Sequence, residues 1–237
     1  MHVLIVHAHP EPTSFNAVLK DLAVAAVEAA GHSVDVADLF AEGFDPVAGR
    51  HDFQSSADPQ RFHYQAEQEH AARTRSFSAD IAREQTRVAR ADLFIFQFPL
   101  WWGGPPAILK GWIERVLAYG FAYVDGRRFE RGLFQGRGAI LCVTTGGTTE
   151  RFSPQGVYGP IEKVLWPMQR LTLQYLGLSV EEPYICYGAP RVDAAAREAY
   201  LAGWRERVGE LVAKPFAARP ISEDAAALPS GAWARPV

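Results

Sequence analysis

The regular alternation of short apolar runs with longer stretches of helical periodicity is the feature of this chain that most constrains its fold. The first run, from Val3 to Ala8, carries no polar face, which is typical of a strand buried inside a parallel sheet. Ser14 then offers a helix N-cap, and apolar residues recur at helical spacing until Gly31. This alternation predicts an α/β fold with a parallel sheet and helices on both of its faces.

The same pattern recurs along the chain. Further strands are predicted at residues 33–36, 92–98, 137–143 and 179–186. Further helices are predicted at residues 80–91, 105–119, 159–175 and 193–212. Five strands in a doubly wound parallel sheet favour the order 2-1-3-4-5.

Two stretches interrupt the alternation. Residues 41–79 are too long for a minimal crossover and carry several aromatic residues, so we expect an excursion that packs on a ligand or on another subunit. Residues 215–237 are rich in alanine and proline, and we expect them to form a C-terminal extension beyond a domain at 1–214. The extension is either mobile or anchored by Phe216 and Trp233.

Composition and charge exclude several classes of function. The formal net charge is −3, so we expect no concentrated basic surface for nucleic acid or for an anionic membrane. No apolar run approaches the roughly 18–20 residues that a membrane helix requires, and the N-terminus has no signal-peptide pattern. Cys142 and Cys186 lie in apolar runs without metal-ligand or CxxC spacing, so we expect buried thiols, no metal site and a cytoplasmic location.

The loop after the first strand suits an anion. Residues 7–16 combine hydroxyl groups and backbone amides, and they lead directly into a helix N-terminus, where phosphate groups bind readily. Neither GxGxxG nor GxxxxGK[ST] is present, which excludes a Rossmann dinucleotide turn and a P-loop. A helix that is merely well capped remains the alternative to a phosphate site.

The loops after the third and fourth strands suit a planar ring. Trp101 and Trp102 precede two glycines, and these indoles form either a flat wall for a heterocycle or simple packing onto the next helix. Residues 144–148 form a short polar loop whose backbone N–H groups can stabilise negative charge. Because the carboxyl ends of parallel strands meet at one edge of the sheet, the three loops together predict a site for a planar cofactor that carries phosphate.

These motifs resemble, in order, those of the NAD(P)H:quinone oxidoreductases of the DT-diaphorase type, the FAD-containing branch of the flavodoxin-like superfamily. The most specific block is Pro-Ala-Ile-Leu-Lys-Gly-Trp at residues 106–112, and the resemblance extends to about residue 205. The other matching segments are residues 13–16, 44–46, 97–100, 114–116, 121–123, 144–147, 155–156 and 165–167.

The resemblance implies FAD as the cofactor, NADH or NADPH as the electron donor, and a quinone or similar small aromatic molecule as the acceptor. Donor and acceptor would occupy the same place in turn, in a ping-pong cycle of two-electron hydride transfer. His63 stands where the family usually has glutamine, and Tyr64 beside it is the alternative contact. The residues implied to hold FAD are His9, Thr13, Ser14, Phe15, Asn16, Ala17, His63, Pro99, Leu100, Trp101, Trp102, Thr144, Thr145, Gly146 and Gly147.

The resemblance also implies a homodimer whose active site lies at the interface, with Tyr123 reaching the flavin of the partner subunit. The implied catalytic residues are Gly146, Gly147 and Tyr158. The implied substrate pocket consists of Trp102, Gly103, Tyr123, Phe152, Tyr158 and Tyr175.

Two departures from the family pattern bear on the acceptor. The family's tyrosine and histidine beside the flavin align with Phe152 and Tyr158, and Gly103 replaces a bulky aromatic residue. We expect the Tyr158 hydroxyl to replace the hydrogen bond of the missing imidazole, unless Tyr158 serves only as a pocket wall.

Three other functions remain open at this stage. The chain could be a regulatory flavoprotein subunit of a potassium-efflux transporter, as some relatives of the family that it resembles are. It could also reduce nitro or azo compounds in place of quinones. An FMN-binding electron-carrier flavodoxin is disfavoured, because the chain is nearly balanced in charge and carries the long excursion at 41–79.

Overall fold

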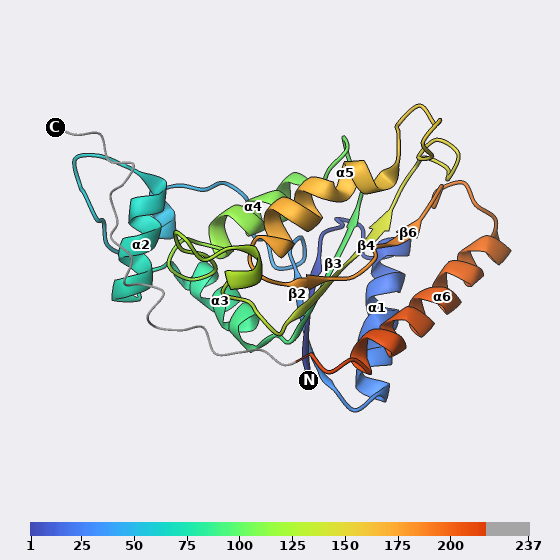
Figure 1. Ribbon diagram of the computed structural model, residues 1–237, viewed down its shortest axis with the longest axis horizontal. Helices are drawn as coiled ribbons and strands as arrows, with labels where there is room; N and C mark the ends of the chain where they lie inside the picture. The colour runs from blue at the N-terminus through green and yellow to red at the C-terminus, as the bar shows by residue number, and fades with distance from the viewer. Residues whose placement is uncertain (217–237) are drawn as a thin grey trace.

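A parallel sheet lies between two layers of helices in the computed structural model, which describes residues 1–216 (Figure 1). The strands are β1 (His2–His7), β2 (Ser33–Asp38), β3 (Leu93–Pro99), β4 (Gly138–Thr144), β5 (Ser179–Val180) and β6 (Tyr184–Cys186). The α-helices are α1 (Phe15–Ala29), α2 (Tyr64–Thr74), α3 (Ala79–Arg90), α4 (Ala107–Val116), α5 (Ile161–Met168) and α6 (Ala194–Val212).

The predicted strand order is confirmed. The strands run in the order β2-β1-β3-β4-β5, and β1, β3 and β4 are in register through Ile5, Ile95 and Ile140. These isoleucines pack under α1 and α6, while the alternate residues of the same strands pack under α3, α4 and α5 (Figure 1). Burial on both faces explains why the central strands read as continuous apolar runs.

The predicted fifth strand is divided in two. β5 and β6 both pair with β4, and residues 181–183 between them belong to no strand. Pro183 lies in this gap and has no backbone N–H to donate to the ladder, so a continuous strand of eight residues cannot form.

The helix predicted at 159–175 changes character halfway along. The α-helical part ends at Met168, and a π-helical turn covers Gln169–Gln174. Pro167 lies at this point and removes one helical hydrogen bond, which is a common cause of a local change in winding. The rewound turn directs Leu171 and Tyr175 toward a cavity described below.

The excursion at 41–79 contains a helix that the sequence pattern did not reveal. α2 has few apolar residues, so its periodicity is weak. The aromatic residues of the excursion pack mainly on one another: Phe53 contacts Phe62, Tyr64 and Phe77 at ring-centroid distances of 5.6 to 6.4 Å. The predicted contact of the excursion with a ligand or a second subunit stays a prediction.

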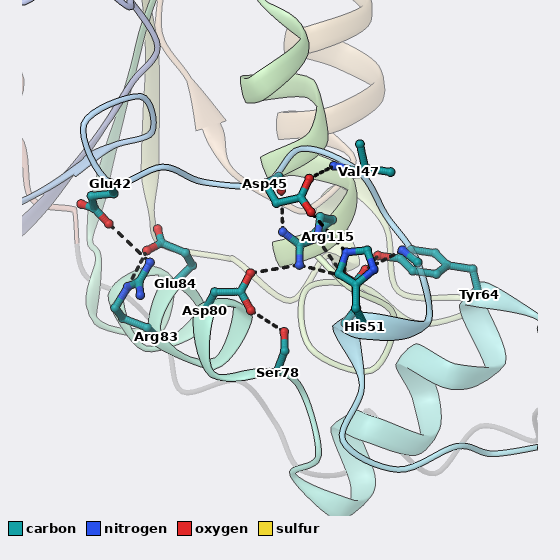
Figure 2. A network of polar contacts seen from close by, with 12 residues as sticks. Glu42, Asp45, Val47, His51, Tyr64, Ser78, Asp80, Arg83, Glu84 and Arg115 are labelled. Atoms are coloured by element: carbon teal, nitrogen blue, oxygen red, sulfur yellow. Dashed lines mark hydrogen bonds and ion pairs between the residues drawn. The ribbon is translucent and has the colours of Figure 1, made fainter.

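A buried ionic network fastens the excursion to α4 (Figure 2). Arg115 of α4 is only 1% exposed, and its guanidinium lies 2.7 Å from Asp52 and 3.0 Å from Asp80. The Tyr64 hydroxyl donates to Asp52 at 2.6 Å, and burial together with this carboxylate raises the pKa of Tyr64. A Cβ atom on Gly111 would collide with Pro46, so glycine is required where the excursion crosses α4.

Cys142 and Cys186 are free and buried, as predicted, and burial raises the pKa of both thiols. Phe216 packs against Gly138 at the start of β4 and extends the core beside α6. Trp233, the second predicted anchor, lies outside the described residues, and the boundary at 214 stays a prediction. No helix within residues 1–216 is both long enough and apolar enough to cross a bilayer.

Candidate functional site

The three predicted loops meet at one cavity of about 530 Å³ at the carboxyl ends of β1, β3 and β4. The sequence predicted most of the residues that line it. Its lining comprises His9, Ser14, Phe15, Asn16, Pro99, Leu100, Trp101, Thr144, Thr145, Gly146, Ala189, Pro190 and Arg197.

The N-terminus of α1 supplies hydrogen-bond donors to this first cavity. The Ser14 side chain caps the helix by accepting from the Ala17 N–H at 3.1 Å. Within residues 1–216, the N–H groups of Phe15 and Asn16 reach no acceptor. Two unengaged donors at the positive end of a helix form a site suited to an anion.

Thr13 and Ala17 do not line the first cavity. The Thr13 hydroxyl donates to the Glu11 carboxylate at 2.6 Å, and this hydrogen bond lowers the pKa of Glu11. Ala17 is buried behind the Ser14 cap. Their predicted contacts with a cofactor stay predictions.

A row of buried polar side chains lies behind the cavity. Asn16 Nδ2 donates to Thr144 Oγ1 at 2.9 Å, and the Gln97 amide donates to the Asn16 carbonyl. In this region three buried atoms find no partner among the described residues: Asn16 Oδ1, Gln97 Oε1 and His7 Nδ1. Burial lowers the pKa of His7 to about 4, so its imidazole is neutral at pH 7. Asn16 therefore presents an unused acceptor beside the cavity.

Trp101 and Gly104 close a tight turn at the rim. Each donates its N–H to the carbonyl of the other at 3.0 Å, and the two residues between them, Trp102 and Gly103, have φ of 50° and 74°. Positive φ is ordinary for glycine but strained for tryptophan. Trp101 lines the cavity, whereas the Trp102 side chain is fully exposed and does not. Only one of the two predicted indole walls is therefore in place within the single chain.

Phe152 and Tyr158, which align with the tyrosine and histidine of the resembled family, lie beside Gly147. A Cβ atom on Gly147 would lie 2.7 Å from Phe152 and 3.1 Å from Tyr158, so only glycine fits beneath these rings. Arg151 donates to the Tyr158 oxygen at 3.5 Å, and the tyrosine is about half exposed at 52%. The predicted catalytic residues thus lie together, although none of these contacts tests their roles.

Three of the remaining predicted residues, His63, Tyr123 and Tyr175, line a second cavity of about 700 Å³, which shares no lining residue with the first. Apart from those named above, the predicted residues that line neither of these two cavities are Gly103, Gly147, Phe152 and Tyr158. Tyr123 and Tyr175 form one wall, with ring centroids 6.1 Å apart, and burial raises the pKa of Tyr123. His63 and Tyr64 form another wall, from the N-terminal end of α2. Within one chain the predicted site is therefore divided between two cavities.

Sequence reasoning missed the part of the first cavity that comes from residues after β6. Ala189, Pro190 and Arg197 line it, and Arg197 forms no ion pair within the described part of the chain. A lone arginine on a late helix belongs to no motif, so only the fold brings it to the loops. The described residues contain no cluster of histidine, cysteine or carboxylate side chains able to hold a metal ion.

Comparison with known proteins identifies the family. A family profile described as "flavodoxin-like fold" matches residues 1–208. NAD(P)H dehydrogenase [quinone] 1 of Cavia porcellus is 45% identical over 206 residues, which cover 86% of this chain and 75% of that protein. Ribosyldihydronicotinamide dehydrogenase [quinone] of Pongo abelii is 44% identical over 207 residues, covering 87% and 90% of the two chains.

A solved structure agrees with these relatives. The crystal structure of a Klebsiella pneumoniae protein, described provisionally as a quinone reductase, superposes with a TM-score of 0.85 at 39% identity. The match covers 89% of this chain and 85% of that one. The chain therefore belongs to the flavodoxin-like family of NAD(P)H:quinone oxidoreductases.

Proposed function

We propose that this protein binds FAD in the first cavity and catalyses the two-electron reduction of quinones, or of similar small aromatic acceptors, by NADH or NADPH. One observation carries the proposal: donors for an anion, an indole wall and the loop of Thr144, Thr145 and Gly146 converge on a single cavity. The identity of 44–45% to quinone dehydrogenases over most of the chain supports the reaction class.

The residues of the first cavity fit a planar cofactor that carries phosphate. The unengaged N–H groups of Phe15 and Asn16, together with the unpaired guanidinium of Arg197, suit a pyrophosphate. Asn16 Oδ1 is a buried acceptor that requires a donor, and a ribityl hydroxyl would supply one. Trp101 offers an aromatic face for the ring system.

A bound flavin would supply the redox chemistry, the transfer of two electrons from the nicotinamide to the acceptor. The protein holds the reactants and stabilises charge. The N–H groups of Gly146, Gly147 and Thr148 reach no acceptor within residues 1–216, so they can donate to the edge of the cofactor where negative charge develops. Trp101 and Leu100 exclude water from one side of the cavity.

We assign hydrogen bonding to the acceptor to Tyr158. Phe152 has no polar atom and can only form a wall. Because Arg151 donates to the phenolic oxygen of Tyr158, the hydroxyl hydrogen is left to donate to a second group. A half-exposed phenol beside the diglycine can therefore replace the family's imidazole as a donor.

We further propose a homodimer in which the second cavity of one chain completes the first cavity of its partner. The supporting observation is an unusual set of exposed apolar side chains. Trp102 is fully exposed and strained, and Leu171, on the rim of the second cavity, is 53% exposed. His63 and Tyr64 would then lie toward the adenine half of the FAD held by the partner, which favours FAD over FMN.

The free thiols of Cys142 and Cys186 support a reducing compartment, and we propose the cytoplasm. We also propose that residues 1–214 form the flavin-binding domain and that the chain beyond them is an extension.

A spectroscopic experiment tests the proposed function. The purified protein should absorb at flavin wavelengths, release FAD on denaturation as identified by mass, bleach with NADH or NADPH, and recover colour with quinones. A panel that includes nitro and azo compounds identifies the preferred acceptor. A colourless protein that binds neither FAD nor FMN would refute the proposal.

A further inference from the structure

The peptide bond between Gly146 and Gly147 is held by a side chain. Arg191 Nη1 donates to the Gly146 carbonyl oxygen at 2.6 Å. The N–H of the same peptide belongs to Gly147 and reaches no acceptor within residues 1–216. Because the C=O and N–H groups of a trans peptide point in opposite directions, the hydrogen bond to Arg191 on one side leaves a free donor on the other.

The neighbouring peptides are fixed by the backbone. The Thr145 carbonyl accepts from the Ala189 N–H at 3.0 Å, and the Gly147 carbonyl accepts from the Gly188 N–H at 2.9 Å. Three successive carbonyls therefore face the segment at 188–191. The middle peptide is the exception, since no backbone group within residues 1–216 holds it, and a glycine on each side gives it the greatest freedom to rotate. Arg191 supplies the missing restraint.

Gly146 lines the first cavity and Gly147 is the next residue, so the orientation of the peptide between them decides whether a donor or an acceptor lies beside that cavity. In the observed orientation Gly147 presents an N–H group. After rotation by half a turn, the Gly146 carbonyl oxygen would take its place and repel negative charge. Arg191 forms no ion pair with any described residue. Its positive charge, like the Gly147 N–H, would therefore stabilise negative charge on the cofactor.

We propose that Arg191 is a positioning residue of the redox site, which keeps the Gly147 N–H as a donor at the edge of the first cavity and thereby favours the reduced, negatively charged cofactor over the oxidised one. This inference rests on the proposed function, because it requires a redox cofactor in that cavity.

Titration of the holoenzyme tests the role of Arg191. For the parent and for Arg191→Ala, the dissociation constants of oxidised and reduced FAD are measured by fluorescence, and the midpoint potential by dye equilibration. Hydrogen bonds to charged groups are stronger than neutral ones, so we expect Arg191→Ala to lower the preference for reduced FAD about tenfold, which is about 30 mV for a two-electron couple. Arg191→Lys, which keeps a charged donor, should lose less than about threefold.

Two results would overturn the inference. One is an Arg191→Ala protein whose preference for reduced FAD lies within twofold of the parent. The other is an equal shift in Arg73→Ala, which removes a positive charge from the exposed face of α2 and so controls for net charge. Both results leave the proposed function intact if the protein still binds FAD and reduces quinones. A protein that binds no flavin would instead refute the proposed function itself.

Discussion

Strain at a single residue marks the rim of the first cavity. Trp102 has a φ of 50°, which strains its backbone, and its apolar indole is fully exposed to water. Both features cost free energy. A bulky residue in this conformation costs roughly 1–3 kcal/mol and is kept mainly where function requires it. The tight turn itself favours Asn-Gly at these two positions.

Trp102→Asn should therefore make the protein more stable and less active. We expect the free energy of unfolding to rise by about 1 kcal/mol, because asparagine tolerates positive φ, while kcat/KM for quinones falls as the indole is lost. Urea denaturation and steady-state kinetics measure the two effects, at a concentration where parent and variant sediment as the same species. Unchanged kinetics would show that the indole has no part in the site.

The hydroxyl of Tyr158 is the second feature that acts at the scale of a residue. Tyr158→Phe keeps the ring, which lies 5.1 Å from that of Phe152, and removes only the donor. Loss of one preorganised donor costs about 10²–10³ in rate, so the rate of acceptor reduction in stopped flow should fall at least tenfold. Tyr187→Phe removes a hydroxyl from a neighbouring ring and serves as the control. If the two variants react equally fast, Tyr158 is only a wall of the pocket.

At the scale of elements, the strands and the loops that follow them were predictable because local pattern determines both. An apolar run covered on two faces identifies a central strand, and its carboxyl end then fixes where the next loop lies. The helix α2 was missed because it has few apolar residues, and polar contacts such as the Gln68 amide donating to the Glu114 carbonyl at 3.2 Å leave no local periodicity. Arg197 and Arg191 were missed because only the fold brings residues after β6 to the loop after β4.

The contact between the excursion at 41–79 and α4 depends on the buried pair of Arg115 and Asp52. Arg115→Leu removes the guanidinium from Asp52, which is 0% exposed and keeps only His51 at 3.3 Å and the hydrogen bonds from Tyr64 and Gly49. Removing one partner of a buried pair costs about 3–5 kcal/mol. Urea denaturation should show this loss. Lys110→Met, which removes the exposed ion pair with Glu114 on the same helix, should cost less than about 1 kcal/mol. An equal loss of unfolding free energy in the two variants would show that the buried network stabilises the protein no more than an exposed ion pair does.

At the scale of the whole molecule, the division of the predicted site between two cavities has a simple explanation in a symmetric dimer. In a two-fold dimer the same pair of surfaces meets twice, so the first cavity of each chain can face the second cavity of its partner. Two complete sites then arise from four half-sites. The exposed apolar side chains around both cavities would be covered in the same assembly.

Complementation between two inactive variants tests this arrangement. Gly147→Val places a side chain against Phe152 and should disable the first cavity, whereas the double variant His63→Ala, Tyr123→Ala should disable the second. If each active site draws on both chains, co-expression gives mixed dimers that hold one intact site and one doubly damaged site. Random pairing makes half of the dimers mixed, so the mixture should recover about a quarter of the parent activity.

The same mixture distinguishes a shared site from a site within one chain. If both cavities served the same chain, every site in a mixed dimer would carry one defect, and the activity of the mixture would equal the mean of the two inactive parents. Differently tagged chains allow the mixed dimer to be isolated and its flavin content measured beside its activity. Recovery in the mixed dimer, with none after the separately purified variants are mixed without exchange, would assign each active site to two chains.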